Sequence, residues 1–111
     1  SIFLNNDDRN YVEPDLSVIC NPSILDEKGC HGAPDWIIEI VSPSSERMDY
    51  VVKTFKYRTA GVREYWVIDK TLQKVTVFDF ENDNMFEYDF TQKIPVLIYD
   101  GELEIDLSRF I

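Results

Sequence analysis

Residues 35–69 constrain the fold of this chain more than any other stretch. Residues 35–41 (Asp-Trp-Ile-Ile-Glu-Ile-Val) are almost wholly apolar, which is typical of a strand that is buried on both faces. Residues 44–61 have helical spacing, and residues 64–69 (Glu-Tyr-Trp-Val-Ile-Asp) form a second strand-type run directly after them. A strand, a helix and a strand in this order predict a right-handed crossover between two parallel strands.

The predicted helix has start and stop signals. Ser44 or Ser45 can cap its N-terminus through the side-chain oxygen, and Gly61 suits the left-handed position that follows a helix. Its buried stripe is predicted at positions three or four residues apart, namely Met48, Val52, Phe55 and Thr59.

Turn-forming residues separate several short runs of β-type composition on either side of this unit. They predict further strands at residues 1–4, 11–20, 74–80, 86–90, 94–99 and 103–107. Residues 5–10 are predicted to be a hairpin turn, residues 21–33 a loop, and the C-terminal end helical. The predicted fold class is therefore α/β, with one mixed β-sheet in a single domain of residues 1–111.

The overall charge limits the partners of the chain. A net charge of -10 argues against a protein that binds phosphate by charge alone, so we expect weak DNA binding unless a partner adds positive charge. No apolar run approaches the ~20 residues that span a bilayer, and two cysteines are consistent with a reducing, cytoplasmic setting. Because the chain opens on a strand-like run without an initiating Met, we expect a fragment of a longer protein.

Two carboxylates are predicted to meet at one end of a strand pair. If the second and third strands pair antiparallel with Ile19 opposite Asp35, the constant index sum sets Asp15 opposite Glu39. Facing residues share a face at ~5 Å between Cα atoms, whereas Asp35 lies ~13 Å from the Asp15 end. This register predicts Asp15 and Glu39, and not Asp35, as ligands of Mg²⁺, for which Mn²⁺ can substitute.

Each candidate also has a structural interpretation. Asp15 could cap a strand end, and Glu39 could pair with a surface base, although a carboxylate inside an apolar strand needs a partner. Lys53 is predicted to lean over the carboxylates from the helix. It could equally form a surface pair with Asp49 four residues earlier, and Lys56 is a competitor on the same helix.

One string of residues resembles a known family. It comprises residues 29–45 (Gly-Cys-His-Gly-Ala-Pro-Asp-Trp-Ile-Ile-Glu-Ile-Val-Ser-Pro-Ser-Ser), then Asp49, Lys53 and Tyr57, and then residues 61–69 (Gly-Val-Arg-Glu-Tyr-Trp-Val-Ile-Asp). With the earlier Pro-Asp, this pattern resembles the Uma family of the PD-(D/E)XK nuclease superfamily, from about Val12 onward.

The resemblance implies roles for three residues. In such proteins the Asp of the first Pro-Asp and the Glu of the following strand bind the metal, and these match Asp15 and Glu39. The superfamily lysine stands two residues after that Glu, a position that is Val41 here, and the family resembles one in which the lysine has moved into the helix, which matches Lys53. The resemblance also implies a restriction-endonuclease-like core that lacks its N-terminal helical part.

The predicted function is a Mg²⁺-dependent endonuclease that hydrolyses DNA phosphodiester bonds, with a homodimer as an additional expectation. Three alternatives stay open. A catalytically inactive domain of this fold could act as a binding module, RNA could replace DNA as substrate, and Cys20, Cys30 and His31 could suggest zinc. The zinc site is the weakest of these because no fourth ligand is evident.

Overall fold

A five-stranded sheet forms the centre of the described chain, which comprises residues 2–4, 14–41 and 47–111 of the computed structural model, with residues 47–50 described in their backbone only. Its strands lie in the order β2 (Leu16–Val18), β5 (Trp36–Val41), β6 (Glu64–Asp69), β7 (Lys74–Asp79) and β8 (Asn84–Asp89). β5 and β6 are parallel, and the other neighbouring pairs of this sheet are antiparallel. Helix α1 (Arg47–Ala60) makes the predicted crossover, so the mixed α/β fold class is confirmed.

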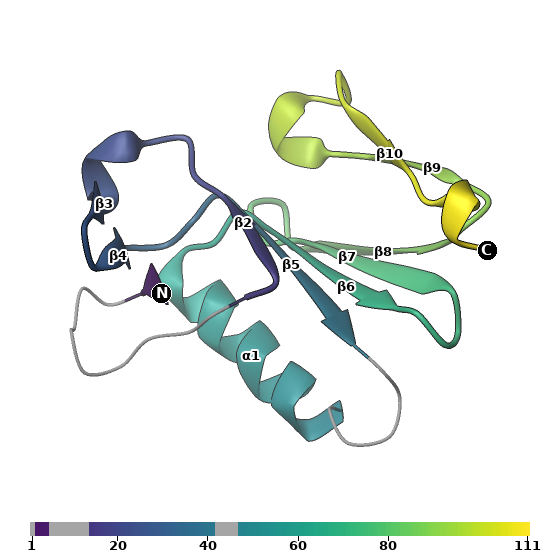
Figure 1. Ribbon diagram of the computed structural model, residues 1–111, viewed down its shortest axis with the longest axis horizontal. Helices are drawn as coiled ribbons and strands as arrows, with labels where there is room; N and C mark the ends of the chain where they lie inside the picture. Colours follow the sequence, from purple (N-terminus) through teal and green to yellow (C-terminus); the bar gives the residue numbers. More distant parts are fainter. Residues whose placement is uncertain (1, 5–13, 42–46) are drawn as a thin grey trace.

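The sheet lies between two layers. Helix α1 covers one face, and a hairpin of β9 (Lys93–Pro95) and β10 (Glu104–Asp106) covers the other (Figure 1). Successive side chains of a strand point to opposite faces, so β5 and β6 each contribute to both layers. On the helix side Ile37 and Tyr65 pack with Tyr57, and on the hairpin side Ile38 and Trp66 pack in a second core. The two cores explain why both strands are apolar almost throughout.

The segment predicted as a loop at residues 21–33 is more ordered than expected. It contains a 3₁₀ turn (η1, Pro22–Ile24) and two short strands, β3 (Leu25–Asp26) and β4 (Gly29–His31). β4 pairs antiparallel with β3 and parallel with β1 (Ile2–Phe3). The loop prediction was therefore wrong: hydrogen bonds to a distant strand order a segment whose composition is typical of turns. Residues 5–13, which include the predicted hairpin turn, lie outside the described residues.

The predicted buried stripe of the helix was wrong. Val52 and Phe55 are 59% and 73% exposed, and Thr59 is exposed as well, whereas Tyr57 is fully buried. The side chain of Met48 lies outside the described residues. The helix buries the face on which Tyr57 contacts Tyr65 of β6, with ring centroids 5.0 Å apart. An aromatic contact and a hydrogen bond from the helix to the sheet, rather than aliphatic spacing, select the buried face.

The predicted C-terminal end of the helix agrees with the structure. Gly61 has φ 100°, and its N–H donates to Arg58 O at 3.3 Å while Val62 N–H donates to Tyr57 O at 3.1 Å. This pair of bonds is the Schellman motif, which needs a residue that tolerates positive φ. The N-cap candidates Ser44 and Ser45 lie outside the described residues.

The C-terminal half has the predicted pairs of strands, but the strand predicted at residues 94–99 was wrong beyond Pro95. β7 and β8 form the expected hairpin, and β9 and β10 form the expected later pair, which is separated by a 3₁₀ turn (η2, Leu97–Tyr99). The chain ends in a further turn of this kind (η3, Ser108–Phe110), in agreement with the helical end. Among the described residues, no helix has the length and apolar character that crossing a membrane requires.

Candidate active site

The strand register at β2 and β5 is the predicted one. Leu16 faces Ile38, and Val18 faces Trp36, which is the index sum that pairs Asp15 with Glu39. Asp15 precedes the first residue of β2, so the pair lies one step beyond the last ladder contact. Because paired residues of an antiparallel ladder share a face, both carboxylates belong to the side of the sheet that carries α1.

The backbone of β5 anchors Asp15. Its side chain is exposed, yet Oδ2 accepts a hydrogen bond from Ile40 N–H at 2.7 Å. Ile40 directly follows Glu39, so this bond attaches the first carboxylate to the strand that carries the second. A carboxylate bound to a backbone N–H makes a stronger bond than a neutral acceptor, which restricts the position of Asp15.

Glu39 is a buried carboxylate with two polar neighbours on helix α1. It is 6% exposed, and its Oε1 accepts a hydrogen bond from the Tyr57 hydroxyl at 3.0 Å and lies 3.5 Å from Lys53 Nζ. Burial raises the pKa of Glu39 above its ordinary value, and the charge of Asp15 raises it further, while Lys53 and Tyr57 act in the opposite direction. Asp15 thus lies close enough to Glu39 for its charge to act on that carboxylate.

Lys53 is the helix lysine that approaches the carboxylates. Its side chain is 30% exposed and lies beside Glu39, whereas Lys56 is exposed on another side of the helix. The structure thus brings together Asp15, Glu39 and Lys53, the three predicted site residues. Their chemical roles stay predictions. The alternative partner of Lys53, Asp49, has its side chain outside the described residues.

The second Pro-Asp of the chain has a structural role. Asp35 Oδ2 accepts from Cys20 N–H at 2.7 Å, and Oδ1 accepts from Arg63 Nη1 at 3.2 Å. It therefore joins the end of β2 to the residue before β6, at the opposite end of β5 from Glu39. Burial alone would raise the pKa of Asp35, but the bonds from Cys20 and Arg63 outweigh it and hold the pKa below its ordinary value.

Substitution of Asp35 should affect stability and leave the carboxylate pair unchanged. Asp35→Asn removes charged hydrogen bonds, so we expect a loss of about 1–3 kcal/mol in the free energy of unfolding at pH 7. A lowered folded-state pKa adds stability above the ordinary value of 3.8, and this contribution disappears as the pH falls through the folded-state pKa. Urea unfolding of both proteins from pH 7 downward should therefore give a difference that shrinks in acid. A difference that is constant with pH would contradict the ionic role.

The candidate zinc ligands do not converge. Cys20 is exposed and Cys30 is buried, and both are free, while His31 Nε2 lies 2.7 Å from Asp26 Oδ2. Within the described ranges, no group of three or more His, Cys, Asp or Glu side chains is arranged to hold a metal ion. Cys30 thus belongs to the core and His31 to an ion pair beside β4, whereas Cys20 lies exposed after β2.

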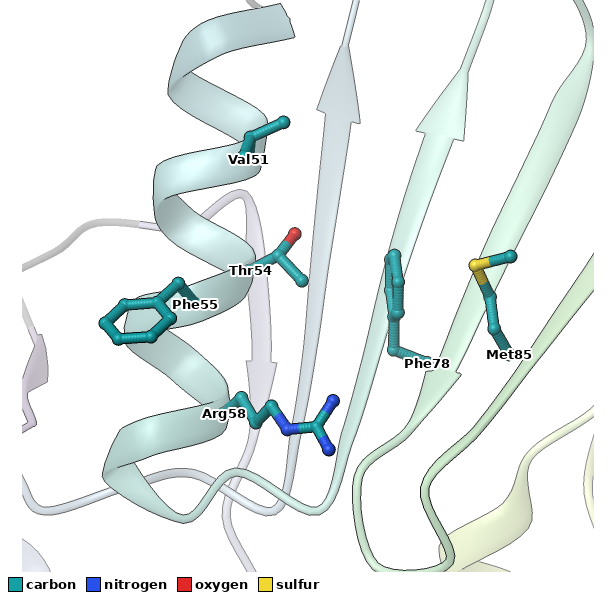
Figure 2. Close-up of a pocket in the computed structure, with 6 residues that line it drawn as sticks. All are labelled: Val51, Thr54, Phe55, Arg58, Phe78 and Met85. Carbon is teal, nitrogen blue, oxygen red and sulfur yellow. The ribbon is translucent and has the colours of Figure 1, made fainter.

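A groove on the other flank of α1 has the wrong chemistry for phosphate. It has a volume of about 410 Å³ and lies between the helix and strands β7 and β8 (Figure 2). Its lining is Val51, Thr54, Phe55, Arg58, Phe78 and Met85. The guanidinium of Arg58 is paired with Asp83, and the remaining side chains include no acid or base. The carboxylate pair, rather than this groove, is therefore the candidate site.

The contacts of two polar residues were not predicted from the sequence. The spacing of four residues places Tyr57 on the same flank of the helix as Lys53, but it did not predict the contact of the Tyr57 hydroxyl with Glu39. Glu64 is 1% exposed, and it accepts hydrogen bonds from Trp66 Nε1 at 2.6 Å and from the N–H groups of Leu97 and Ile98 at 3.2 and 2.9 Å. The last two contacts attach the C-terminal hairpin to the sheet, and no local pattern signals them.

Comparison with known proteins identifies the family of the chain. The family model Uma2, described as "Putative restriction endonuclease", matches residues 2–107. The chain belongs to the Uma2 family. The earlier resemblance to the Uma family is thereby confirmed, and the match covers both the carboxylate pair and the helix that carries Lys53.

A solved structure also resembles this Uma2 chain. It is the crystal structure of a putative nuclease belonging to DUF820 from Anabaena variabilis, with a TM-score of 0.69 and 26% sequence identity over 89% of this chain. The chain spans 59% of the length of that protein. A search of the curated proteins found no match.

The carboxylates of this Uma2 chain fit a hard divalent cation. Among the described residues, hydrogen bonds engage Oδ2 of Asp15 and Oε1 of Glu39. Mg²⁺ takes one or two protein carboxylates and completes its octahedron with water or substrate oxygens, so a third side-chain ligand is not required. Burial raises the pKa of Glu39 because it disfavours the ionised form, and a bound cation would favour that form.

Proposed function

We propose that this Uma2 chain is a Mg²⁺-dependent endonuclease that hydrolyses DNA phosphodiester bonds. The observation that carries the proposal is the convergence of Asp15, Glu39 and Lys53, which lie just before β2, in β5 and in α1. The family description and the nuclease of similar fold support the reaction class. In this proposal residues 1–111 act as a single endonuclease-like domain.

Each of the three residues would have a separate role. Asp15 and Glu39 would hold the cation through their second oxygens, and Lys53, whose Nζ lies 3.5 Å from Glu39, would orient the attacking water or neutralise charge that develops on the phosphate. A bound Mg²⁺ supplies a water of lowered pKa and positive charge for the scissile phosphate. Glu39 remains beneath the helix, where low solvent exposure strengthens its interaction with a cation.

The proposed partners follow from charge and from symmetry. A net charge of -10 gives little affinity for the DNA backbone, so the cation and any partner must supply attraction to the substrate. Cutting both strands of a duplex needs two active sites, which a homodimer would provide. Free Cys20 and Cys30 are consistent with a reducing cytoplasmic location, which belongs to the proposal as well.

Plasmid cleavage tests the proposal. The wild-type chain should nick or linearise DNA in Mg²⁺ or Mn²⁺ and not in EDTA, and Asp15→Asn should lower the rate by about a hundredfold or more because it removes a ligand. Asp35→Asn is the matched control, since it alters the other Pro-Asp and should cleave at nearly the wild-type rate. Activity that survives both Asp15→Asn and Glu39→Gln would defeat the assignment.

A pair of lysine variants tests the helix contribution within the same assay. Lys53→Met should slow cleavage by about 10–1,000-fold at saturating metal, because it removes a positive charge from the site. Lys56→Met removes the same charge from an exposed position on the same helix and should have little effect. Equal losses in both variants would indicate a general charge effect on DNA binding.

The alternative function is a binding module without catalysis. The acidic net charge favours it, and so does the presence of a lysine beside Glu39, which could simply neutralise a buried acid. Calorimetry with Mn²⁺ separates the two functions. An endonuclease site should bind Mn²⁺ in a manner that depends on Glu39, and an inactive domain should show no such binding.

A further inference from the structure

The hydroxyl of Tyr57 is the feature of the site whose role the proposed function leaves open. Tyr57 is fully buried in the last part of α1, and its ring packs against Tyr65 of β6. Its hydroxyl donates to Glu39 Oε1 at 3.0 Å, a contact between residues that lie 18 positions apart in the sequence. The bond connects the helix to the strand at the buried carboxylate.

Packing alone does not require this hydroxyl. Phenylalanine would fill the same space beside Tyr65 with the same ring, whereas a hydroxyl in the core costs stability unless it finds a partner. The partner that it finds is a carboxylate, and a bond to an ionised acceptor is stronger than one to a neutral group. The hydroxyl of Tyr57 is therefore explained by its hydrogen bond to Glu39 and not by the packing of the core.

Among the described residues, two side chains of α1 approach the same oxygen of the Glu39 carboxylate. Tyr57 and Lys53 both approach Oε1, at 3.0 and 3.5 Å. The terminal torsion of a glutamate is soft, so an unrestrained carboxylate samples a broad range of orientations. The lysine is 30% exposed and has a flexible stem, whereas the phenol is rigid and fully enclosed. Tyr57 is thus the group that can restrict the orientation of the carboxylate.

We propose that Tyr57 is a positioning residue that holds Glu39 Oε1 and thereby presents Oε2 in one orientation to the divalent cation. The inference rests on the proposed function, because it assigns to Tyr57 a task at that same site. Groups that orient metal ligands through hydrogen bonds commonly contribute about 10–100-fold to metal affinity. Tyr57→Phe should therefore weaken Mn²⁺ binding by about that factor while the ring packing is preserved.

The experiment measures Mn²⁺ binding by calorimetry on the wild-type chain, Tyr57→Phe and Tyr65→Phe. Tyr65 is a matched control because it is as buried as Tyr57 and the two rings contact each other. Within the described residues, the Tyr65 hydroxyl is not among the contacts of Glu39. We expect weaker binding in Tyr57→Phe alone. In the metal-free proteins, the ¹³C shift of the Glu39 carboxyl group should change in Tyr57→Phe and stay constant in Tyr65→Phe.

Each contrary outcome overturns a specific statement. Equal Mn²⁺ affinity in the wild type and in Tyr57→Phe would overturn the positioning role and leave the proposed function intact. Absence of Mn²⁺ binding in the folded wild type would overturn the proposed function, and the inference with it. A Tyr57→Phe chain that fails to fold would assign the hydroxyl to folding and overturn the inference as well.

Discussion

Glu39→Gln should raise the melting temperature of the metal-free protein at pH 8 and slow DNA cleavage by about a hundredfold or more. The carboxylate is buried, and its raised pKa means that the folded state disfavours the ionised form. A raised folded-state pKa contributes stability below the ordinary value of 4.5, and this contribution is lost as the pH rises through the folded-state pKa. At pH 8 the ionised Glu39 therefore reduces stability, and a neutral amide that still accepts from Tyr57 removes this penalty.

Thermal unfolding in EDTA and plasmid cleavage in Mn²⁺ measure the two effects. The stability difference should shrink as the pH is lowered toward 4.5, where wild-type Glu39 becomes neutral. Glu87→Gln is the control, because Glu87 is exposed and pairs with Lys74 on the sheet surface. A lower melting temperature for Glu39→Gln at pH 8 would show that the ionised carboxylate stabilises the fold through Lys53, and it would favour the inactive binding module. Opposite changes in stability and activity are typical of functional carboxylates.

Glu64→Ala should reduce the free energy of unfolding more than the other substitutions proposed above. Glu64 accepts hydrogen bonds from Trp66 Nε1, Leu97 N–H and Ile98 N–H, and all three donors would lose their acceptor. Because buried donors without partners are expensive, we expect a loss of about 3–5 kcal/mol in the free energy of unfolding, or roughly 15 °C or more in melting temperature. Chemical denaturation at pH 7 measures this loss.

The location of the damage can also be tested. The contacts to Leu97 and Ile98 join the hairpin of β9 and β10 to the sheet, so amide exchange in residues 93–107 should accelerate more than exchange in α1. Glu87→Ala, which removes an exposed glutamate from β8, should change stability by less than ~0.5 kcal/mol. If Glu64→Ala unfolded no more easily than Glu87→Ala, the link between Glu64 and the hairpin would contribute nothing to stability.

The candidate site was predictable because it depends on local rules. Once Ile19 is assumed to face Asp35 in an antiparallel pair, the constant index sum sets Asp15 opposite Glu39, and the observed ladder has that register. Lys53 follows from its place on the helix that returns over the same strands. In each case the sequence spacing translates directly into position, since strands and helices have regular geometry.

The buried face of the helix was not predictable in the same way. Val52 and Phe55 have helical spacing and strong hydrophobicity, yet they are exposed, while Tyr57 is buried against Tyr65. Hydrophobic periodicity shows which side chains of a helix are apolar, but it does not show which residues of the sheet each side chain will contact. Glu39 is such a residue, and its hydrogen bond with Tyr57 joins two different elements.

By itself, the sequence determined the α/β fold class and the parallel crossover through residues 35–69, whereas the register that pairs Asp15 with Glu39 was assumed and agrees with the observed ladder. These features depend on periodicity and turn chemistry, which act over a few residues. Only the tertiary structure decided which face of α1 is buried, that Asp35 binds Cys20 and Arg63, and that the C-terminal hairpin attaches at Glu64. The physical reason is that a buried carboxylate must find hydrogen-bond donors wherever the folded chain brings them, and their distance along the sequence has no influence on that choice.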